Sequence, residues 1–210
     1  DFAELLLRCV ELFQQHPDVL AQYHAQFRLL LVDEFQDTNA IQYRWLKLLA
    51  GPHCSVMAVG DDDQSIYGWR GARVENITRF IEDFKEVDVI RLEQNYRSSN
   101  TILQAANSLI SHNRERMGKS LWTQGEYGEK ICLYSAFNEL EEAIFVREQI
   151  QKELQAGRDA NNMAILYRSN AQSRVMEEAL LRARIAYLIH GGMRFFERAE
   201  IKDALAYLRL

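Results

Sequence analysis

Two short apolar runs, each leading directly into carboxylates, constrain the fold of this chain more than any other feature. Residues 29–32 read LLLV and precede Asp33 and Glu34, and residues 55–59 read SVMAV and precede GDDD. The amphipathic stretch 41–49 separates the two runs. Strand, helix and strand in this order, with nearly continuous apolar strands, is typical of a buried parallel sheet in an α/β protein. Ligands of such sheets bind beyond the carboxyl ends of the strands, which is where both acidic clusters fall.

The remaining residues alternate between helical and extended patterns. Apolar periodicity predicts helices over 2–27 with a break at Pro17, and over 76–84, 101–113, 140–155 and 173–183. Short apolar runs predict further strands at 87–92, 131–134, 163–167 and 187–189. A second series of strands and helices after residue 93 indicates a second sheet or lobe, with a domain boundary near that residue.

Composition limits the classes of protein that this chain can represent. The 210 residues are 48% hydrophobic and 26% charged, which is enough for one large or two small domains with real cores. No apolar run reaches the roughly 18 residues that span a bilayer, and the first residues lack the basic start of a signal peptide. We therefore expect a cytoplasmic protein with no membrane partner. Cys9, Cys54 and Cys132 have no CxxC or CxxH spacing, which argues against disulfides and a zinc site.

The charge distribution argues against a protein that binds nucleic acid over its whole surface, because the net charge is −5. A local groove is still compatible with this value. Residues 1–93 contain 9 Lys and Arg against 16 Asp and Glu, whereas residues 94–210 contain 16 against 14. An anionic partner should therefore contact mainly the second half of the chain.

Asp33 and Glu34 are the first candidate catalytic residues. An Asp directly after an apolar strand is the position from which nucleotide hydrolases hold Mg²⁺, and a neighbouring carboxylate is placed to polarise the attacking water. Asp33 would then be the metal ligand and Glu34 the general base. The alternative is that acidic residues close this strand simply because the chain has reached water.

The motif GDDDQSIYGWRGA, residues 60–72, strengthens the functional interpretation. Gln64 is a neutral donor and acceptor, able to sense a terminal phosphate or a water. Tyr67 and Trp69 lie beside Arg70 and Arg73, and aromatics interleaved with arginines suit a groove for single-stranded nucleic acid. The alternative is a loop whose aromatic side chains cap the core.

The motif EQNYRSS, residues 93–99, supplies a cation at the start of the second lobe. Arg97 could reach a transferring phosphate as an arginine finger, and Tyr96 could stack on a purine base. The alternative for Arg97 is an ordinary salt bridge before a helix. The string GKS at residues 118–120 is not a P-loop, because the first glycine of GxxxxGK[ST] is missing and a helix precedes the string instead of a strand.

In combination and in this order, the motifs LLLVDEFQDTN, VGDDDQSIYGWRGA, LEQNYRSS, SLWT and AILYRSNAQSR resemble the UvrD/Rep/PcrA type of superfamily 1 DNA helicases. The resemblance implies an ATP-driven 3′-to-5′ translocase on single-stranded DNA, built from two RecA-like parallel-sheet domains with ATP between them. It also implies roles for individual residues. These are Mg²⁺ binding for Asp33, the catalytic base for Glu34, terminal-phosphate contact for Gln64, the arginine finger for Arg97, adenine stacking for Tyr96, and DNA contact for Tyr67, Trp69, Arg70, Arg168 and Asn170.

The resemblance further implies how the chain divides and which parts of the site it holds. Residues 1–27 would end a helical accessory insertion, 28–93 would form the distal half of the first motor domain, 94–190 the proximal half of the second, and 191–210 the start of another insertion. The Walker A lysine and the adenine-reading glutamine would precede Asp1, so we expect the isolated chain to have little or no ATPase activity. The implied partners are ATP, single-stranded DNA, its junctions with duplex DNA, and proteins of DNA repair or replication, in a nucleoid-associated location.

Two other functions are compatible with parts of the sequence. Several carboxylates are required for a two-metal nuclease, and Asp33, Glu34, Asp61, Asp62 and Asp63 could supply them. That hypothesis leaves Gln64, Trp69 and Arg97 without a role. A non-catalytic nucleic-acid-binding module is the second alternative, in which the chain binds DNA and hydrolyses nothing.

Overall fold

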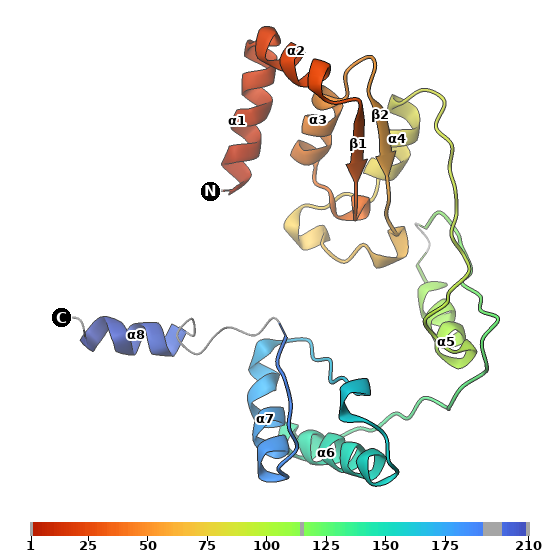
Figure 1. The fold of residues 1–210 in the computed structure, drawn as a ribbon, viewed down its shortest axis with the longest axis vertical. Helices are drawn as coiled ribbons and strands as arrows, with labels where there is room; N and C mark the ends of the chain where they lie inside the picture. The colour runs from red at the N-terminus through yellow and green to blue at the C-terminus, as the bar shows by residue number, and fades with distance from the viewer. Residues whose placement is uncertain (1, 114–115, 191–198, 209–210) are drawn as a thin grey trace. The chain divides into compact units, whose positions relative to one another are not determined.

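The computed structural model describes residues 2–113, 116–190 and 199–208. The chain divides into two compact units, Asp1–Ile131 and Cys132–Leu210. Figure 1 shows a small parallel sheet with helices packed against it in the first unit, and a pair of packed helices in the second. The described fold is therefore mixed helix and strand, as the sequence predicts.

The helices from α1 to α7 lie close to the predicted ranges. The first unit contains α1 (Phe2–Gln15), α2 (Pro17–Gln26), α3 (Ala40–Leu49), α4 (Asn76–Asp83) and α5 (Asn100–Ile110), and the second contains α6 (Glu139–Gln155), α7 (Ser173–Arg182) and α8 (Ala199–Leu208). The predicted break at Pro17 is confirmed, because this proline occupies the first turn of α2, where its missing N–H costs nothing. Asn39 begins α3 with a capping box, in which its side chain accepts from the Gln42 N–H and the Gln42 side chain accepts from the Asn39 N–H.

The sheet consists of β1 (Leu29–Val32) and β2 (Ser55–Ala58), which pair in parallel with Leu29 opposite Ser55. In both strands, half-buried side chains alternate with exposed ones. Leu31 is 68% exposed and Met57 is 56% exposed. Within the described residues, this chain therefore covers one face of the strands and leaves the other open, although the apolar sequence predicts burial on both faces.

The core of the first unit lies on the covered face. Phe35, Tyr43, Leu46 and Phe80 form a buried cluster, and Phe35 packs edge-on against Phe80 with ring centroids 5.4 Å apart. Burial of each such side chain stabilises the fold by about 1.5–3 kcal/mol. The Tyr43 hydroxyl donates to Asp83 at 2.7 Å, which joins α3 to α4. This cluster fixes the carboxyl ends of both strands.

In the second unit, α6 packs against α7. Ala143 of α6 is fully buried, and Ala179 and Leu180 of α7 are nearly so. Tyr134 stacks on Phe145 with centroids 3.9 Å apart, so the extended segment before α6 lies against that helix.

The four later strand predictions, at 87–92, 131–134, 163–167 and 187–189, are wrong for this structure, in which these segments form no ladder. A strand requires a neighbour whose N–H and C=O groups it can pair with, and the described residues offer none at these positions. Their apolar side chains are largely exposed: Ile90 82%, Leu92 82%, Leu133 95%, Leu166 89% and Leu188 78%. The predicted segment 191–210 falls partly on residues outside the described ranges.

Candidate functional site

The carboxyl end of β1 carries Asp33 and Glu34 on an abrupt turn. Glu34 has a left-handed backbone, with φ 49° and ψ 44°, which is uncommon for a residue that has a side chain. Its N–H donates to Asp33 Oδ1 at 2.9 Å, and both residues are exposed. The 3-10 helix that follows begins with Phe35, which enters the core. The fold therefore holds two accessible carboxylates at the sheet edge, and the backbone strain lies at Glu34.

Gln36 joins the ends of the two strands. It is 1% exposed, its Nε2 donates to Glu34 Oε2 at 2.6 Å, and its Oε1 accepts from the Asp61 N–H at 2.9 Å. A Cβ on Gly60 would lie 2.7 Å from Gln36 Oε1, so only glycine allows this approach. The sequence does not single out Gln36, because nothing except its place two residues after Glu34 signals the role.

The acidic cluster Asp61, Asp62 and Asp63 brings one oxygen of each carboxylate within 4.8 Å of the others. Arg116 donates two hydrogen bonds to Asp63, from Nε at 2.9 Å and from a terminal nitrogen at 2.7 Å. Lys119 forms an ion pair with Asp61. Two of the three carboxylates, Asp61 and Asp63, are therefore paired with cations of the protein itself.

Gln64 lies within hydrogen-bond reach of the same cluster. Its Nε2 donates to Asp61 Oδ2 at 2.7 Å, and the residue is otherwise exposed. Burial raises the pKa of Asp61, but hydrogen bonds from Lys119 and Gln64 outweigh it and leave that pKa below its usual value. The hydrogen bond to Asp63 raises the pKa of Arg116. Asp61 is therefore a carboxylate at neutral pH. It accepts the hydrogen bond from Gln64 and so holds the Gln64 side chain.

The predicted aromatic and arginine residues gather on one loop. The Arg70 guanidinium lies 4.8 Å from the Tyr67 ring centroid and 4.5 Å from that of Trp69. Trp69 is 70% exposed, so it does not cap the core, whereas Tyr67 is half-buried. The Arg73 N–H donates to the Thr38 carbonyl at 2.9 Å, which ties the loop to the segment after Glu34. An exposed aromatic face beside a guanidinium suits a stacked base and its phosphate.

Tyr96 and Arg97 lie on a turn that precedes α5. The Tyr96 hydroxyl donates to Gln94 at 2.8 Å, and the Arg97 N–H donates to Asn95 Oδ1 at 2.9 Å. Tyr96 is 85% exposed, and Arg97 is exposed as well. Among the described residues no hydrogen bond or ion pair joins either side chain to the carboxylates that follow β1. The salt bridge that sequence leaves open for Arg97 is likewise absent from the described part of the chain.

Arg168 and Asn170 belong to the second unit. They flank Ser169, which begins a short 3-10 helix with a capping box involving Gln172. The Arg168 N–H donates to Gln172 Oε1 at 3.1 Å, and both predicted DNA-contact residues are exposed. The loop is thus ordered by its own hydrogen bonds and leaves the Arg168 and Asn170 side chains accessible.

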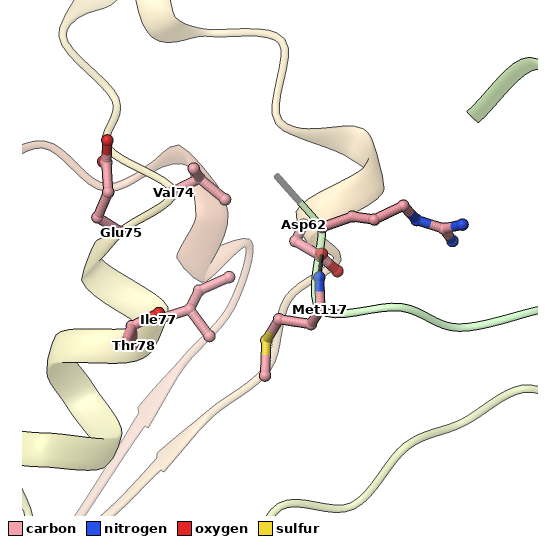
Figure 2. Close-up of a pocket in the computed structure, with 7 residues that line it drawn as sticks. Asp62, Val74, Glu75, Ile77, Thr78 and Met117 are labelled. Carbon is pink, nitrogen blue, oxygen red and sulfur yellow. Dashed lines mark hydrogen bonds between the residues drawn. The ribbon is translucent and has the colours of Figure 1, made fainter. Parts of the chain in front are cut away.

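A cavity of about 360 Å³ lies beside the acidic cluster. Figure 2 shows Asp62 and Met117 together on one side, facing residues at and before the start of α4. The Met117 N–H donates to Asp62 at 2.7 Å. The labelled lining residues are Asp62, Val74, Glu75, Ile77, Thr78 and Met117. The segment that carries Met117 therefore forms one wall of the cavity against the acidic loop.

Two family descriptions match consecutive parts of the chain. The UvrD/REP helicase N-terminal domain matches residues 1–85, and the UvrD-like helicase C-terminal domain matches residues 90–210. The chain belongs to the UvrD-like helicase family. The family resemblance expected from the motifs is thereby confirmed. The two matched domains meet between residues 85 and 90, whereas the compact units divide after Ile131.

Curated relatives in the UvrD-like family are similar along the whole chain. Identity is 62% to DNA helicase II of Haemophilus influenzae, 63% to DNA helicase II of Escherichia coli, and 50% to the ATP-dependent DNA helicase PcrA of Staphylococcus aureus. The 210 residues are covered completely in each comparison, but they span only 29% of each relative.

The ion pairs of the acidic cluster weigh against a two-metal nuclease site. A two-metal site requires several carboxylates that are available to bind cations. Asp61 and Asp63 are bound to Lys119 and Arg116 instead. Asp33 and Glu34 form no ion pair within the described residues.

None of the described helices combines the length and the apolar character needed to cross a bilayer.

Proposed function

We propose that this chain forms the central part of an ATP-dependent DNA helicase, which couples Mg²⁺-ATP hydrolysis to 3′-to-5′ movement on single-stranded DNA. One observation carries the proposal: hydrogen bonds run without a break from Glu34 through Gln36 and Asp61 to Gln64. A general base and a phosphate sensor are thereby linked at one sheet edge. Family membership supports the same activity, since the relatives are named as DNA helicases. The polarity is inferred from the resemblance alone.

Asp33 is the residue we assign to Mg²⁺. Its carboxylate is exposed at the end of β1, and Oδ1 already accepts the Glu34 N–H while Oδ2 accepts nothing within the described residues. A carboxylate oxygen in this state fits the oxygen-preferring, water-retaining coordination of Mg²⁺. When bound with ATP, the metal would offset negative charge on the phosphates.

Glu34 is the residue we assign as the general base. Gln36 donates to one of its carboxylate oxygens, Oε2, and so fixes the side chain while the other oxygen stays available to a water. Gln64 would contact the terminal phosphate. Gln64 is connected to Glu34 through Asp61 and Gln36. We propose that movement of Gln64 is passed to Glu34 by this route.

Tyr96 and Arg97 are assigned to adenine stacking and to the arginine finger. Their exposure supports these assignments, since a finger must be free to reach a phosphate and a stacking ring must present its face. Their turn precedes α5 and lies within the part of the chain that matches the C-terminal domain. The arrangement in the ATP-bound state is part of the proposal.

For DNA we assign one loop in each compact unit. Tyr67, Trp69 and Arg70 would stack on bases and meet phosphates, and stacking tolerates any sequence because every base has an aromatic face. Arg168 and Asn170, in the second unit, would also contact single-stranded DNA. Junctions of single-stranded with duplex DNA, and repair proteins, are further partners that we infer from the family.

Two RecA-like motor domains are the architecture that we propose for the complete protein. The small parallel sheet with acidic strand ends supports the first of them. We keep the division into 1–27, 28–93, 94–190 and 191–210 as part of the same proposal, together with a cytoplasmic, nucleoid-associated location. The 210 residues contain no GxxxxGK[ST] loop, so we expect the isolated chain to hydrolyse little ATP.

The test is ATP hydrolysis by the longer helicase in which we propose this chain to lie. We expect single-stranded DNA to stimulate hydrolysis, and Glu34→Gln to lower kcat by about 100-fold or more, because the base is lost while its shape is kept. Glu82→Gln, an exposed position on α4, is the matched control and should change little.

Two outcomes would reject the proposal. Retention of kcat within about twofold in Glu34→Gln would remove the general base from the mechanism. Binding of single-stranded DNA by the longer protein with no nucleotide hydrolysis would favour the non-catalytic binding module.

A further inference from the structure

The segment 116–119, which follows α5, binds all three carboxylates of the acidic cluster. Arg116 forms the two hydrogen bonds to Asp63, and both side chains are mostly buried, at 17% and 12% exposed. The Met117 N–H donates to Asp62. Lys119 forms an ion pair with Asp61 and lies 3.9 Å from Asp63.

The segment is held in shape by a contact within itself. Arg116 also donates to the Lys119 carbonyl oxygen at 2.6 Å, so the two cations are oriented together. A planar guanidinium that meets a carboxylate with two parallel hydrogen bonds fixes direction as well as distance. The contact is therefore specific in geometry and is more than an attraction between opposite charges.

The cations and the carboxylates of this contact lie in stretches that match different family domains. Asp61 and Asp63 lie in the stretch that matches the N-terminal helicase domain, and Arg116 and Lys119 lie in the stretch that matches the C-terminal domain. All four belong to the first compact unit. The contact thus joins residues of the two matched domains inside one unit.

Hydrogen bonds of Asp61 connect this contact to Gln64 and Gln36. Asp61 receives Lys119 on Oδ1 and Gln64 on Oδ2, and its backbone N–H donates to Gln36. Lys119 and Gln64, the proposed phosphate sensor, therefore share one partner, Asp61. Loss of the Lys119 charge would leave a half-buried carboxylate with only neutral partners and would free Asp61 to turn.

We propose that Arg116 and Lys119 are positioning residues for ATP hydrolysis, because they hold Asp61 and Asp63 in the orientation that places Gln64. This inference rests on the proposed function, since it requires Gln64 to act on the terminal phosphate. It goes beyond that function by assigning a role to the segment 116–119. Neither residue contacts substrate in this role.

The first experiment measures DNA-stimulated ATP hydrolysis by the longer helicase with substitutions at Lys119. Lys119→Met should lower kcat by about tenfold and change KM for ATP by less than about twofold, since the phosphate sensor is displaced while nucleotide binding elsewhere is kept. Lys119→Arg should recover most of the rate. Lys85→Met removes the same charge from an exposed position and is the matched control.

The second experiment tests the route through Gln64. In a Gln64→Ala background, Lys119→Met should cause little further loss, because both changes act on one group. The double variant Arg116→Asp with Asp63→Arg exchanges the two charges of the ion pair. It should hydrolyse ATP faster than either single variant. Thermal unfolding of each variant separates loss of position from loss of fold.

The outcomes distinguish this inference from the proposed function. A wild-type protein that does not hydrolyse ATP contradicts the proposed function. An active wild type with an unchanged kcat in Lys119→Met overturns the positioning role, as do effects of Lys119→Met and Gln64→Ala that multiply independently. A reduced kcat that Lys119→Arg fails to recover, accompanied by a lower unfolding temperature, also overturns it.

Discussion

The two acidic clusters at the sheet edge have similar sequences and opposite electrostatic surroundings. Asp33 and Glu34, after β1, are exposed and form no ion pair within the described residues. Asp61 and Asp63, after β2, are half-buried and are bound to Lys119 and Arg116. A carboxylate whose charge is already balanced by the protein is a poor ligand for an added cation. The comparison supports our proposal that the first cluster binds the metal and that the second positions Gln64.

The largest expected effect comes from neutralising one carboxylate in each cluster. Asp33→Asn should lower the rate of Mg²⁺-dependent ATP hydrolysis by about 100-fold, whereas Asp62→Asn should lower it only a few-fold. The measurement is kcat as a function of Mg²⁺ concentration in the longer helicase. Equal losses in the two variants would break the distinction between the clusters.

A second, smaller effect is expected at Gln36, the residue that connects the clusters. Gln36→Ala removes a buried side chain with two hydrogen bonds and leaves the Asp61 N–H without its partner. We expect the free energy of unfolding to fall by about 2 kcal/mol and the rate of hydrolysis to fall as well. Chemical denaturation and steady-state kinetics measure the two changes. A stable variant with full activity would show that the clusters work independently.

Low pH should weaken the second cluster. The folded-state pKa of Asp61 lies below its usual value, so its stabilising contribution is complete above the unfolded pKa of about 3.9 and is lost as pH falls through the folded pKa. Wild type should therefore lose more stability than Asp61→Asn when pH falls from about 5 to about 3. Denaturation midpoints across this range provide the measurement. Parallel pH profiles would contradict the pKa shift.

The smallest effect is expected away from both clusters, at Asp83. Hydrogen bonds from Lys47 and Tyr43 lower the pKa of Asp83, but the Lys47 side chain is 45% exposed. Solvent screens such a pair, so Asp83→Asn should change the free energy of unfolding by less than about 1 kcal/mol. It should leave hydrolysis unaltered. If Asp83→Asn lowers the free energy of unfolding as much as Gln36→Ala does, the two acidic clusters have no special weight in the stability of the fold.

Local pattern was enough to predict the helices and the first two strands. Pro17 divides the first helical stretch because proline cannot continue a helix but suits its first turn. Residues 29–32 and 55–58 become strands because their neighbours lie within the same chain and pair with them. Residues 163–167 have equally apolar character but form no strand, since a strand depends on a partner that pattern does not reveal.

The candidate site was predictable only in part. The sequence predicts Asp33 and Glu34 from their positions after an apolar strand, Gln64 from its neutral donor and acceptor side chain, and the aromatic loop from its composition. These site residues stay predictions. It did not identify Gln36, because a buried glutamine has no sequence signature. Nor did it identify Arg116 and Lys119, which are 53 and 58 positions from their partners. Contacts over such separations follow from the path of the chain in space.

The sequence by itself determined which residue types stand at the strand ends and which family the motifs resemble. Only the tertiary structure decided which carboxylates are available, because availability depends on whether a cation from elsewhere in the chain reaches them. Asp33 and Asp63 are the same amino acid after similar strands, yet one is exposed and the other is held by Arg116. Charge is a property of the residue, whereas its neutralisation is a property of the fold.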